Sequence, residues 1–297
     1  MKRAIALGLF LVAPAAMAEP IWVGDFETGD WSQWSSEIDV HEGTTDRVQV
    51  VTEPVAQGRF ALKTTVRHGD INNNGSRAEV VLREPMFHQG DDVWFHWFTM
   101  FPEDYQPTEK WVLYTQWHSS GFGVPLGFNL HDETLSFRVM GHEYDRRSDW
   151  TGGTMWEAQL ERGKWMEFLL HVKFSDADDG FIEVWKDGEQ IVAGTNHPTL
   201  DPGDYVYLKQ GLYRDKSIPY DMTIYHDGMT AYSSRPDEVF ARWEGGGADD
   251  GGSETPDPAD DSTDTSVGCG EALGLAALLP MFGLGRLLQR LRRGRNK

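Results

Sequence analysis

Residues 180–192 have the sequence GFIEVWKDGEQIV, which predicts a β-hairpin. Strand-forming residues, among them β-branched and aromatic ones, flank Asp187-Gly188, and this dipeptide is typical of the tight turn that joins two paired strands. Segments on either side of the hairpin show the same strand pattern, with turns rich in Gly, Pro and Asp between them. We expect further strands at 48–51, 61–66, 78–82, 93–98, 111–116, 135–140, 205–213 and 222–226.

The pattern as a whole predicts an all-β protein. Strand signals are dense, helix signals are scarce, and no internal repeat of fixed period is visible. Strands of this length and spacing indicate a sandwich or jelly roll of two antiparallel sheets. We expect one large domain over residues 19–244, because its length suits one all-β domain better than two small ones.

The N-terminus has the three parts of a secretory signal peptide, predicted over residues 1–18. Lys2 and Arg3 supply the positive start, residues 4–12 the apolar run, and Ala16-Met17-Ala18 the small-residue cleavage site. We therefore expect the protein to be exported.

The C-terminal part changes character sharply. Residues 245–267 form an acidic linker that is too polar to bury a core, so we expect it to be disordered. Residues 268–297 contain Gly268-Cys269-Gly270, an apolar stretch and a basic end, and they resemble bacterial C-terminal sorting tails. That resemblance implies a secreted or cell-surface protein that meets the membrane only through this tail; an amphipathic surface helix is the alternative. Cys269 is the only cysteine, so the domain folds without a disulfide.

Three short segments place polar residues two positions apart. They are Ser76-Arg77-Ala78-Glu79, Gln116-Trp117-His118, and the run from Tyr207 to Tyr213 that includes Lys209. On a β-strand, residues two apart project from the same face. Three such strands side by side place the polar residues on one concave surface, and we expect that surface to be the site.

These segments, in this order, resemble the three signature strands of alginate-lyase-type jelly-roll polysaccharide lyases. The overall layout is similar to the group of bacterial heparin-lyase-I-like and glucuronan lyases, with the opening Asp25-Phe26-Glu27-Thr28-Gly29-Asp30 and the pair Trp165 and Trp185 as further features. The resemblance spans most of residues 20–240 and implies a concanavalin-like β-jelly-roll sandwich. The sequence departs from the pattern at Trp117, at Gln210 and at Arg214-Asp215, and these departures bear on the substrate more than on the chemistry.

The resemblance implies β-elimination on 1,4-linked uronate polymers, giving 4,5-unsaturated products. Arg77 and Gln116 would neutralise the uronate carboxylate, which the reaction needs because negative charge develops beside it. His118 and Tyr213 would move protons, with Tyr213 serving the leaving oxygen. When the C5 proton and O4 leave from the same side, as in glucuronate, Tyr213 can be both base and acid. When they leave from opposite sides, as in guluronate, His118 becomes the base.

The remaining candidates are substrate-binding residues. We expect Glu79 to orient Arg77, and Lys209 and Tyr207 to line the groove. Trp117 is a candidate surface for sugar stacking, and Arg83 is the nearest equivalent of a second arginine in the first segment.

The net charge of −20 repels a polyanionic substrate at long range, so we expect an acidic exterior around a basic groove. Glucuronan or alginate is preferred over heparin, because the chain has no basic run for sulfate groups. The partner is thus an acidic polysaccharide, with no nucleic acid, and the protein is expected to be a monomer. No cofactor is required, but Asp25 with Asp221 or Asp227 is a candidate structural calcium site.

Two other functions remain open. Glu37-Ile38-Asp39-Val40-His41-Glu42 matches the carboxylate strand of laminarinase-like retaining glycoside hydrolases, in which Glu37, Asp39 and Glu42 would face one cleft. Its place near the first strands argues against this reading. A non-catalytic surface carbohydrate-binding module is the other possibility.

Overall fold

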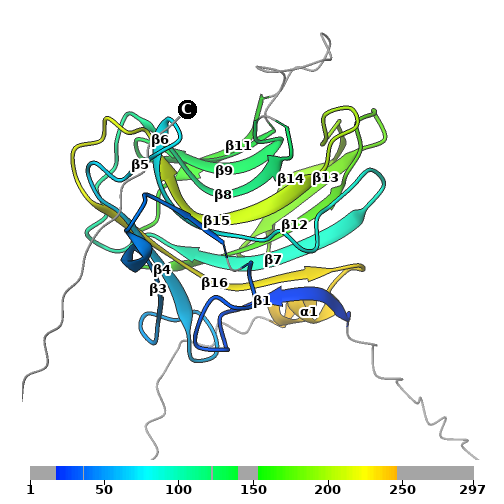
Figure 1. The fold of residues 1–297 in the computed structure, drawn as a ribbon. Helices are drawn as coiled ribbons and strands as arrows, with labels where there is room; N and C mark the ends of the chain where they lie inside the picture. The colour runs from blue at the N-terminus through cyan, green and yellow to red at the C-terminus, as the bar shows by residue number, and fades with distance from the viewer. Residues whose placement is uncertain (1–17, 36, 122, 140–152, 246–297) are drawn as a thin grey trace, which may run out of the picture. The chain divides into compact units, whose positions relative to one another are not determined.

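The computed structural model describes residues 18–35, 37–121, 123–139 and 153–245. Two antiparallel sheets of eight strands each make up the fold, and they confirm the predicted all-β jelly-roll sandwich. Figure 1 shows the sheets as curved layers, with β15, β8 and β9 in one and β7 and β16 in the other. The predicted linker and tail lie outside the described residues, as does the signal peptide except for its last residue, so these assignments stay predictions.

The first sheet packs one face against the second sheet. In order across the sheet, its strands are β14 (Glu189–Asn196), β13 (Phe181–Lys186), β12 (Trp165–Lys173), β7 (Asp92–Met100), β16 (Met222–Tyr232), β4 (Ala61–Val66) and β3 (Val48–Val51), and β1 (Pro20–Gly24) pairs with β16. The predicted hairpin is β13–β14, and Asp187 and Gly188 at its turn both have positive φ, at 50° and 83°. That geometry is the one expected for Asp-Gly in a two-residue hairpin turn.

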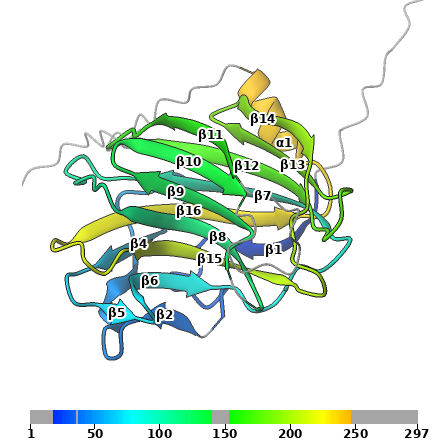
Figure 2. The same cartoon turned by 90° about the horizontal axis from the view of Figure 1, so that it is seen from above.

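The second sheet bears the candidate site on its outer face. Its strands, in order, are β11 (Gly153–Gln159), β10 (Thr134–Val139), β9 (Leu126–His131), β8 (Trp111–Ser119), β15 (Val206–Arg214), β6 (Gly75–Val81) and β2 (Ile38–Val40), and β5 (Ile71–Asn72) pairs with β6. Figure 2 shows these strands side by side in this order. In Figure 1 the concave side of β15, β8 and β9 faces away from the first sheet.

The core lies between the sheets and is unusually aromatic. Trp97 of β7 meets Trp117 of β8, Phe128 of β9 and Phe168 of β12, with ring centroids 5.1–5.9 Å apart. Such rings bury large apolar areas, and replacing one by Ala typically costs about 3–5 kcal/mol. A fold without any disulfide among its described residues therefore draws its stability from this packing.

Several elements escape prediction from the sequence pattern. They are β1, β2, β5, β9, β11, β12, the short 3-10 helix η1 (Thr45–Arg47) and helix α1 (Asp237–Glu244). Helix α1 packs Val239 and Phe240 against Trp94 and Trp185 on the other face of the first sheet. Within the part of the chain that the structure describes, no helix is long and apolar enough to cross a membrane.

Candidate active site

Side-chain alternation on β6 sends Arg77 and Glu79 to the outer face of the second sheet and Ala78 and Val80 into the core. The neighbouring strands β15 and β8 bring their polar residues to the same face. Tyr213 lies opposite Arg77, Lys209 opposite Gln116, and Tyr207 opposite His118. We call this set, together with Asp39 of β2, the outer-face cluster. The pairing of β15 with both β6 and β8 therefore confirms the prediction that the three segments are adjacent strands.

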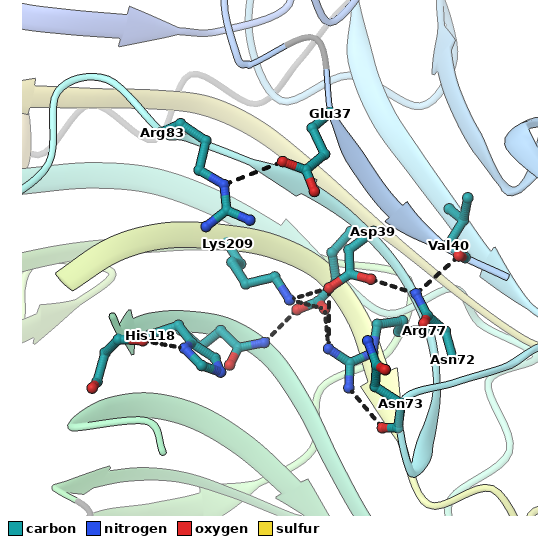
Figure 3. Close-up of polar contacts among 12 residues, drawn as sticks. Glu37, Asp39, Val40, Asn72, Asn73, Arg77, Arg83, His118 and Lys209 are labelled. Carbon is teal, nitrogen blue, oxygen red and sulfur yellow. Dashed lines mark hydrogen bonds and ion pairs between the residues drawn. The ribbon is translucent and has the colours of Figure 1, made fainter. Parts of the chain in front are cut away.

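The centre of the outer-face cluster consists of four charged side chains, Asp39, Glu79, Arg77 and Lys209. Figure 3 labels Asp39, Arg77 and Lys209 and marks the contacts between them. Lys209 Nζ lies 2.7 Å from Asp39 Oδ2 and 2.8 Å from Glu79 Oε2. Arg77 Nη1 lies 3.1 Å from the same Asp39 oxygen and 3.8 Å from Glu79 Oε2. Glu79 and Lys209 are almost fully buried, whereas the Asp39 side chain is 23% exposed. Asp39 is thus the member of the four that faces solvent most.

Three side chains of this centre, Asp39, Lys209 and Arg77, have shifted pKa values, and each of them stays charged at neutral pH. Burial opposes the ionisation of Asp39, but Lys209 and Arg77 outweigh it and hold the pKa of Asp39 below its ordinary value. Burial likewise opposes the charge on Lys209 and Arg77, and the nearby Glu79 and Asp39 raise the pKa of each base. The centre therefore contains two positive groups compensated by two carboxylates.

This compensation corrects the expectation of a basic groove. Arg83, the third cation of this region, also pairs with a carboxylate, because its Nε lies 3.4 Å from Glu37 Oε2. Three cations thus meet three carboxylates, two of which come from the segment around β2. The excess of positive charge fails to appear because β2 pairs with β6 and places Asp39 directly beside Glu79.

Gln116 is oriented by Glu79. Its amide nitrogen donates a short hydrogen bond to Glu79 Oε1, and a carboxylate is an acceptor only, which fixes the direction of the amide. Gln116 Oε1 and Arg77 Nε are buried without a hydrogen-bond partner among the described residues. Glu79 contacts Gln116 and Lys209 more closely than it contacts Arg77, so its orienting role is wider than predicted.

His118 lies at one end of the outer-face cluster. Its Nδ1 donates to the Ser119 carbonyl at 2.7 Å, which leaves Nε2 as the unprotonated nitrogen of the neutral ring. Burial lowers the pKa of His118, and neighbouring Lys209 acts in the same direction. The ring stacks on Tyr207 with centroids 5.2 Å apart. His118 is therefore neutral and available as a base at neutral pH.

The strand end that bears His118 is held in place by Asp204. The hydroxyl groups of Ser119 and Ser120 both donate to this carboxylate, and the backbone N–H of Gly121 lies 3.1 Å from it. These contacts tie the end of β8 to the segment that precedes β15, so the imidazole has a defined position before any substrate binds.

Tyr213 lies at the other end, six residues further along β15 than Tyr207. The Arg77 guanidinium carbon lies 3.8 Å from the centre of its ring, a cation–π contact. A Cβ atom at Gly75 would come within 2.2 Å of the Tyr213 ring, so the ring needs a glycine beneath it. Tyr213 is consequently fixed directly over the cation that is predicted to bind the uronate carboxylate.

The prediction that Trp117 stacks on substrate is wrong. The side chain is completely buried and packs against Phe95 and Trp97, because the alternation that turns Gln116 and His118 outward turns Trp117 into the core. The exposed aromatic residue of this region is Trp111, 40% exposed at the start of β8, with its ring centroid 4.7 Å from that of Tyr213. The sequence gives no signal for this contact, because it depends on the register between β8 and β15.

Arg83 and Tyr207 form a second arginine–tyrosine pair, with the guanidinium carbon 4.3 Å from the ring centre. Tyr207 in turn contacts His118, so this pair extends the outer-face cluster beyond the imidazole. Asp39 is the site residue that the lyase interpretation overlooked. The sequence signal for Asp39 is the Glu-x-Asp spacing of residues 37–39, a spacing that is also typical of the hydrolase alternative.

The three carboxylates predicted as calcium ligands each contact a different set of groups. Asp25 accepts a hydrogen bond from Gln33, Asp221 pairs with Arg67, and Asp227 accepts the backbone N–H groups of residues 56 and 57. Burial raises the pKa of Asp227 to about 7. Among the described residues, no group of three or more His, Cys, Asp or Glu side chains could hold a metal ion.

Only part of the carboxylate segment 37–42, on which the hydrolase alternative depends, lies at the candidate site. Glu37 and Asp39 reach the outer face, but Glu42 lies exposed in the turn that follows β2. Asp39 is held ionised by two cations, so it is unsuited to the role of general acid.

Comparison with known proteins gives both a family and a fold. A family model described as "Polysaccharide lyase" matches residues 26–230. No curated protein matches the chain. Among solved structures, the chain is similar to an endo-β-1,4-glucuronan lyase from the fungus Trichoderma reesei, with 19% identity and a TM-score of 0.60 over 73% of this chain and 96% of that one.

Two further similar structures come from glycoside hydrolase family 131. One is a β-glucanase catalytic domain from Podospora anserina, with 14% identity and a TM-score of 0.53 over 73% of this chain and 97% of that one. The other is a catalytic domain from Coprinopsis cinerea, with 14% identity and a TM-score of 0.54 over 73% of this chain and 95% of that one. At these identities all three structural likenesses concern the fold alone.

Proposed function

This chain belongs to the polysaccharide lyase family and is a polysaccharide lyase, and we propose that it cleaves 1,4-linked uronic-acid polymers, of the glucuronan type in the first place, by β-elimination. One observation supports this proposal above the others. The cation Arg77, the amide Gln116 and the phenol Tyr213 meet on one face of one sheet, and the imidazole of His118 lies on the same face.

The first requirement of the reaction is to neutralise the uronate carboxylate. Removing the C5 proton places negative charge next to a group that is already charged, so the proton is barely acidic until that carboxylate is bound. In the proposal, Arg77 supplies the cation and Gln116 the amide donor. Glu79 supports both, because it holds the Gln116 amide and lies 3.8 Å from Arg77.

The second requirement is proton transfer. The base takes the C5 proton, the electrons of that C–H bond form the C4–C5 double bond, and the C4–O4 bond breaks as O4 receives a proton. In glucuronate both groups leave from the same side, so Tyr213 in its phenolate form takes the C5 proton, and the phenol that results donates a proton to O4. In guluronate they leave from opposite sides, and the neutral Nε2 of His118 serves as the base.

A panel of polyuronates tests the proposal. Lyase products carry a double bond conjugated to the carboxylate and absorb in the ultraviolet, whereas hydrolase products do not. We expect Tyr213→Phe to abolish product formation on every substrate and His118→Ala to have its largest effect on guluronate-rich alginate. Tyr225→Phe on the first sheet and His68→Ala on an exposed loop are the matched controls, and both should behave as wild type. Full activity of Tyr213→Phe would contradict the proposal.

Two observations support testing the hydrolase alternative in the same experiment. Asp39 belongs to the outer-face cluster and Glu37 pairs with Arg83 next to it, and family 131 catalytic domains share the fold. In that case the polymer would be shortened without ultraviolet absorption, and Glu37→Gln would stop the reaction. A non-catalytic carbohydrate-binding module would show neither product, and replacing His118 or Tyr213 would change its affinity alone.

We propose further that the protein is exported and acts as a monomer outside the cytoplasm, in secreted or surface-attached form. The signal-peptide pattern of residues 1–18 and the sorting-tail pattern of residues 268–297 support this. Cell fractionation, with the N-terminal sequence of the mature protein, tests it: a mature chain that begins at Glu19 is expected, and an intact Met1 in a cytoplasmic fraction would contradict it.

A further inference from the structure

The outer-face cluster has a charge pattern that carbohydrate binding by itself does not require. A site that bound polyanions by net charge would leave its cations free, yet Arg77 and Lys209 share Asp39 Oδ2, and Arg83 pairs with Glu37. The chain as a whole has a formal net charge of −20, so long-range attraction of a polyanion is absent as well.

The buried cations Lys209 and Arg77 have a counter-ion besides Asp39. Glu79 lies 2.8 Å from Lys209 and 3.8 Å from Arg77, and it is the carboxylate enclosed in the sheet. Asp39 is a second carboxylate on the same two cations, placed on the more exposed side.

The position of Asp39 is fixed from its other side. Its Oδ1 accepts a hydrogen bond of 2.6 Å from the Asn72 amide, which also donates to the Val40 carbonyl at 2.9 Å. A carboxylate that is held in this way stays on the cations when a ligand approaches. An incoming anion must therefore share Arg77 with Asp39 rather than meet a free guanidinium.

We propose that Asp39, assisted by Glu37, is a specificity-determining residue that makes the site accept uronate polymers with a single charge on each sugar and reject sulfated polymers, which carry additional charges. This inference rests on the proposed function of the same site. A single uronate carboxylate can gain directed hydrogen bonds from Arg77 and Gln116 while it meets little repulsion. A sulfated chain brings several more negative charges toward Asp39 and Glu37, and that repulsion discriminates against it.

Binding measurements on a non-cleaving background test the inference. The full chain with Tyr213→Phe, which is expected to cleave none of the polymers, is titrated with glucuronan and with heparin over a series of salt concentrations, and Asp39→Asn or Glu37→Gln is then added. Asn keeps the shape of Asp and an acceptor oxygen for the two cations. Glu42→Gln is the matched control, since it removes one negative charge from the exposed turn after the same strand.

We expect Asp39→Asn to bind heparin about tenfold more tightly at low salt, with a smaller change for glucuronan, because one unit of nearby repulsion is removed in partly screened surroundings. The gain should shrink as salt rises. Glu37→Gln should change binding in the same direction and less. If Asp39→Asn does not fold, Glu37→Gln decides, because the Glu37 side chain is 64% exposed and that of Arg83 is 38% exposed, so their pair contributes little to folding.

An unchanged preference between the two polymers in both variants would overturn the inference. An equal shift in Glu42→Gln would overturn it too, because the effect would then follow total charge. The proposed function fails separately: wild-type protein would yield no unsaturated product from any polyuronate, whatever the binding preference of the variants.

Discussion

Replacing Glu79 by Gln should destabilise the domain strongly, because this carboxylate is the enclosed counter-charge of the outer-face cluster. Its side chain is 2% exposed and that of Lys209 is 3% exposed, with 2.8 Å between the charged atoms. Gln has the same shape but no charge, and its NH2 group must face either the Gln116 amide or the Lys209 ammonium, both of which are donors. The cluster would keep two buried cations and only Asp39 to balance them.

The expected loss follows from that imbalance. Breaking a buried pair by removing one partner typically costs about 3–5 kcal/mol. For a domain of this size, each kcal/mol lowers Tm by roughly 2–4 °C, so Tm should fall by roughly 6–20 °C. The free energy of unfolding is measured by urea denaturation followed by tryptophan fluorescence. The exposed pair Arg67–Asp221 provides the control: its side chains are 53% and 59% exposed, and Asp221→Asn should cost less than about 1 kcal/mol.

A double variant separates lost charge pairing from lost packing. Glu79→Gln combined with Lys209→Met leaves Arg77 paired with Asp39, so it should be more stable than Glu79→Gln alone by about 2 kcal/mol. The reasoning is refuted if Glu79→Gln costs less than about 1 kcal/mol, or if the two substitutions add without coupling.

Three further predictions concern the glycine of β15, the two tryptophans of β8 and a buried histidine. Gly211→Ala should cost more than about 2 kcal/mol and abolish turnover, since φ is 145° and a Cβ would lie 2.3 Å from the Ala78 carbonyl oxygen; near-wild-type urea stability would contradict this. Trp117→Ala should cost about 3–5 kcal/mol, whereas Trp111→Ala should weaken polymer binding several-fold at almost unchanged stability, and the reverse outcome in titration and denaturation would disprove the assignment. Burial lowers the pKa of His226 from 6.5 to about 3, so the unfolded chain takes up the proton first and stability falls as pH drops below 6.5, by about 1.4 kcal/mol per pH unit. His226→Gln should make the stability curve less steep between pH 6.5 and 5, with part of the slope left because burial also lowers the pKa of His96 to about 3, and an unchanged slope in urea denaturation would refute the cause.

Each of these three predictions has a control within the same protein. Gly203→Ala is the control for Gly211, because Gly203 also has positive φ (74°) but an added Cβ atom there would meet nothing within 4 Å, so only the backbone preference is lost. The two tryptophans control for each other, being the same residue type on one strand. For His226→Gln, the reference is the pH dependence of wild-type stability, since the carboxylates contribute equally to the stability curves of the two proteins.

Much of the fold is predictable because the relevant physics is local. The β13–β14 hairpin follows from the strand-forming residues around Asp187-Gly188, and eight further strand segments follow from their own strand-forming residues. Strand β2 escapes prediction because it is three residues long, and β12 because the central run Phe168–Val172 lacks a clear polar alternation. Helix α1 is missed because its apolar residues gain their partners only when they reach the outer side of the first sheet.

The amino-acid sequence alone determined which polar residues share a face within β6, β8 and β15, since side chains alternate along a strand whatever it pairs with. The tertiary structure alone decided which strands are neighbours, and thereby which charges meet. Asp39 lies 170 residues from Lys209 along the chain, and only the pairing of β2 with β6 brings it to that ammonium group. Contacts of such separation depend on the closure of the whole sheet, which no local pattern encodes.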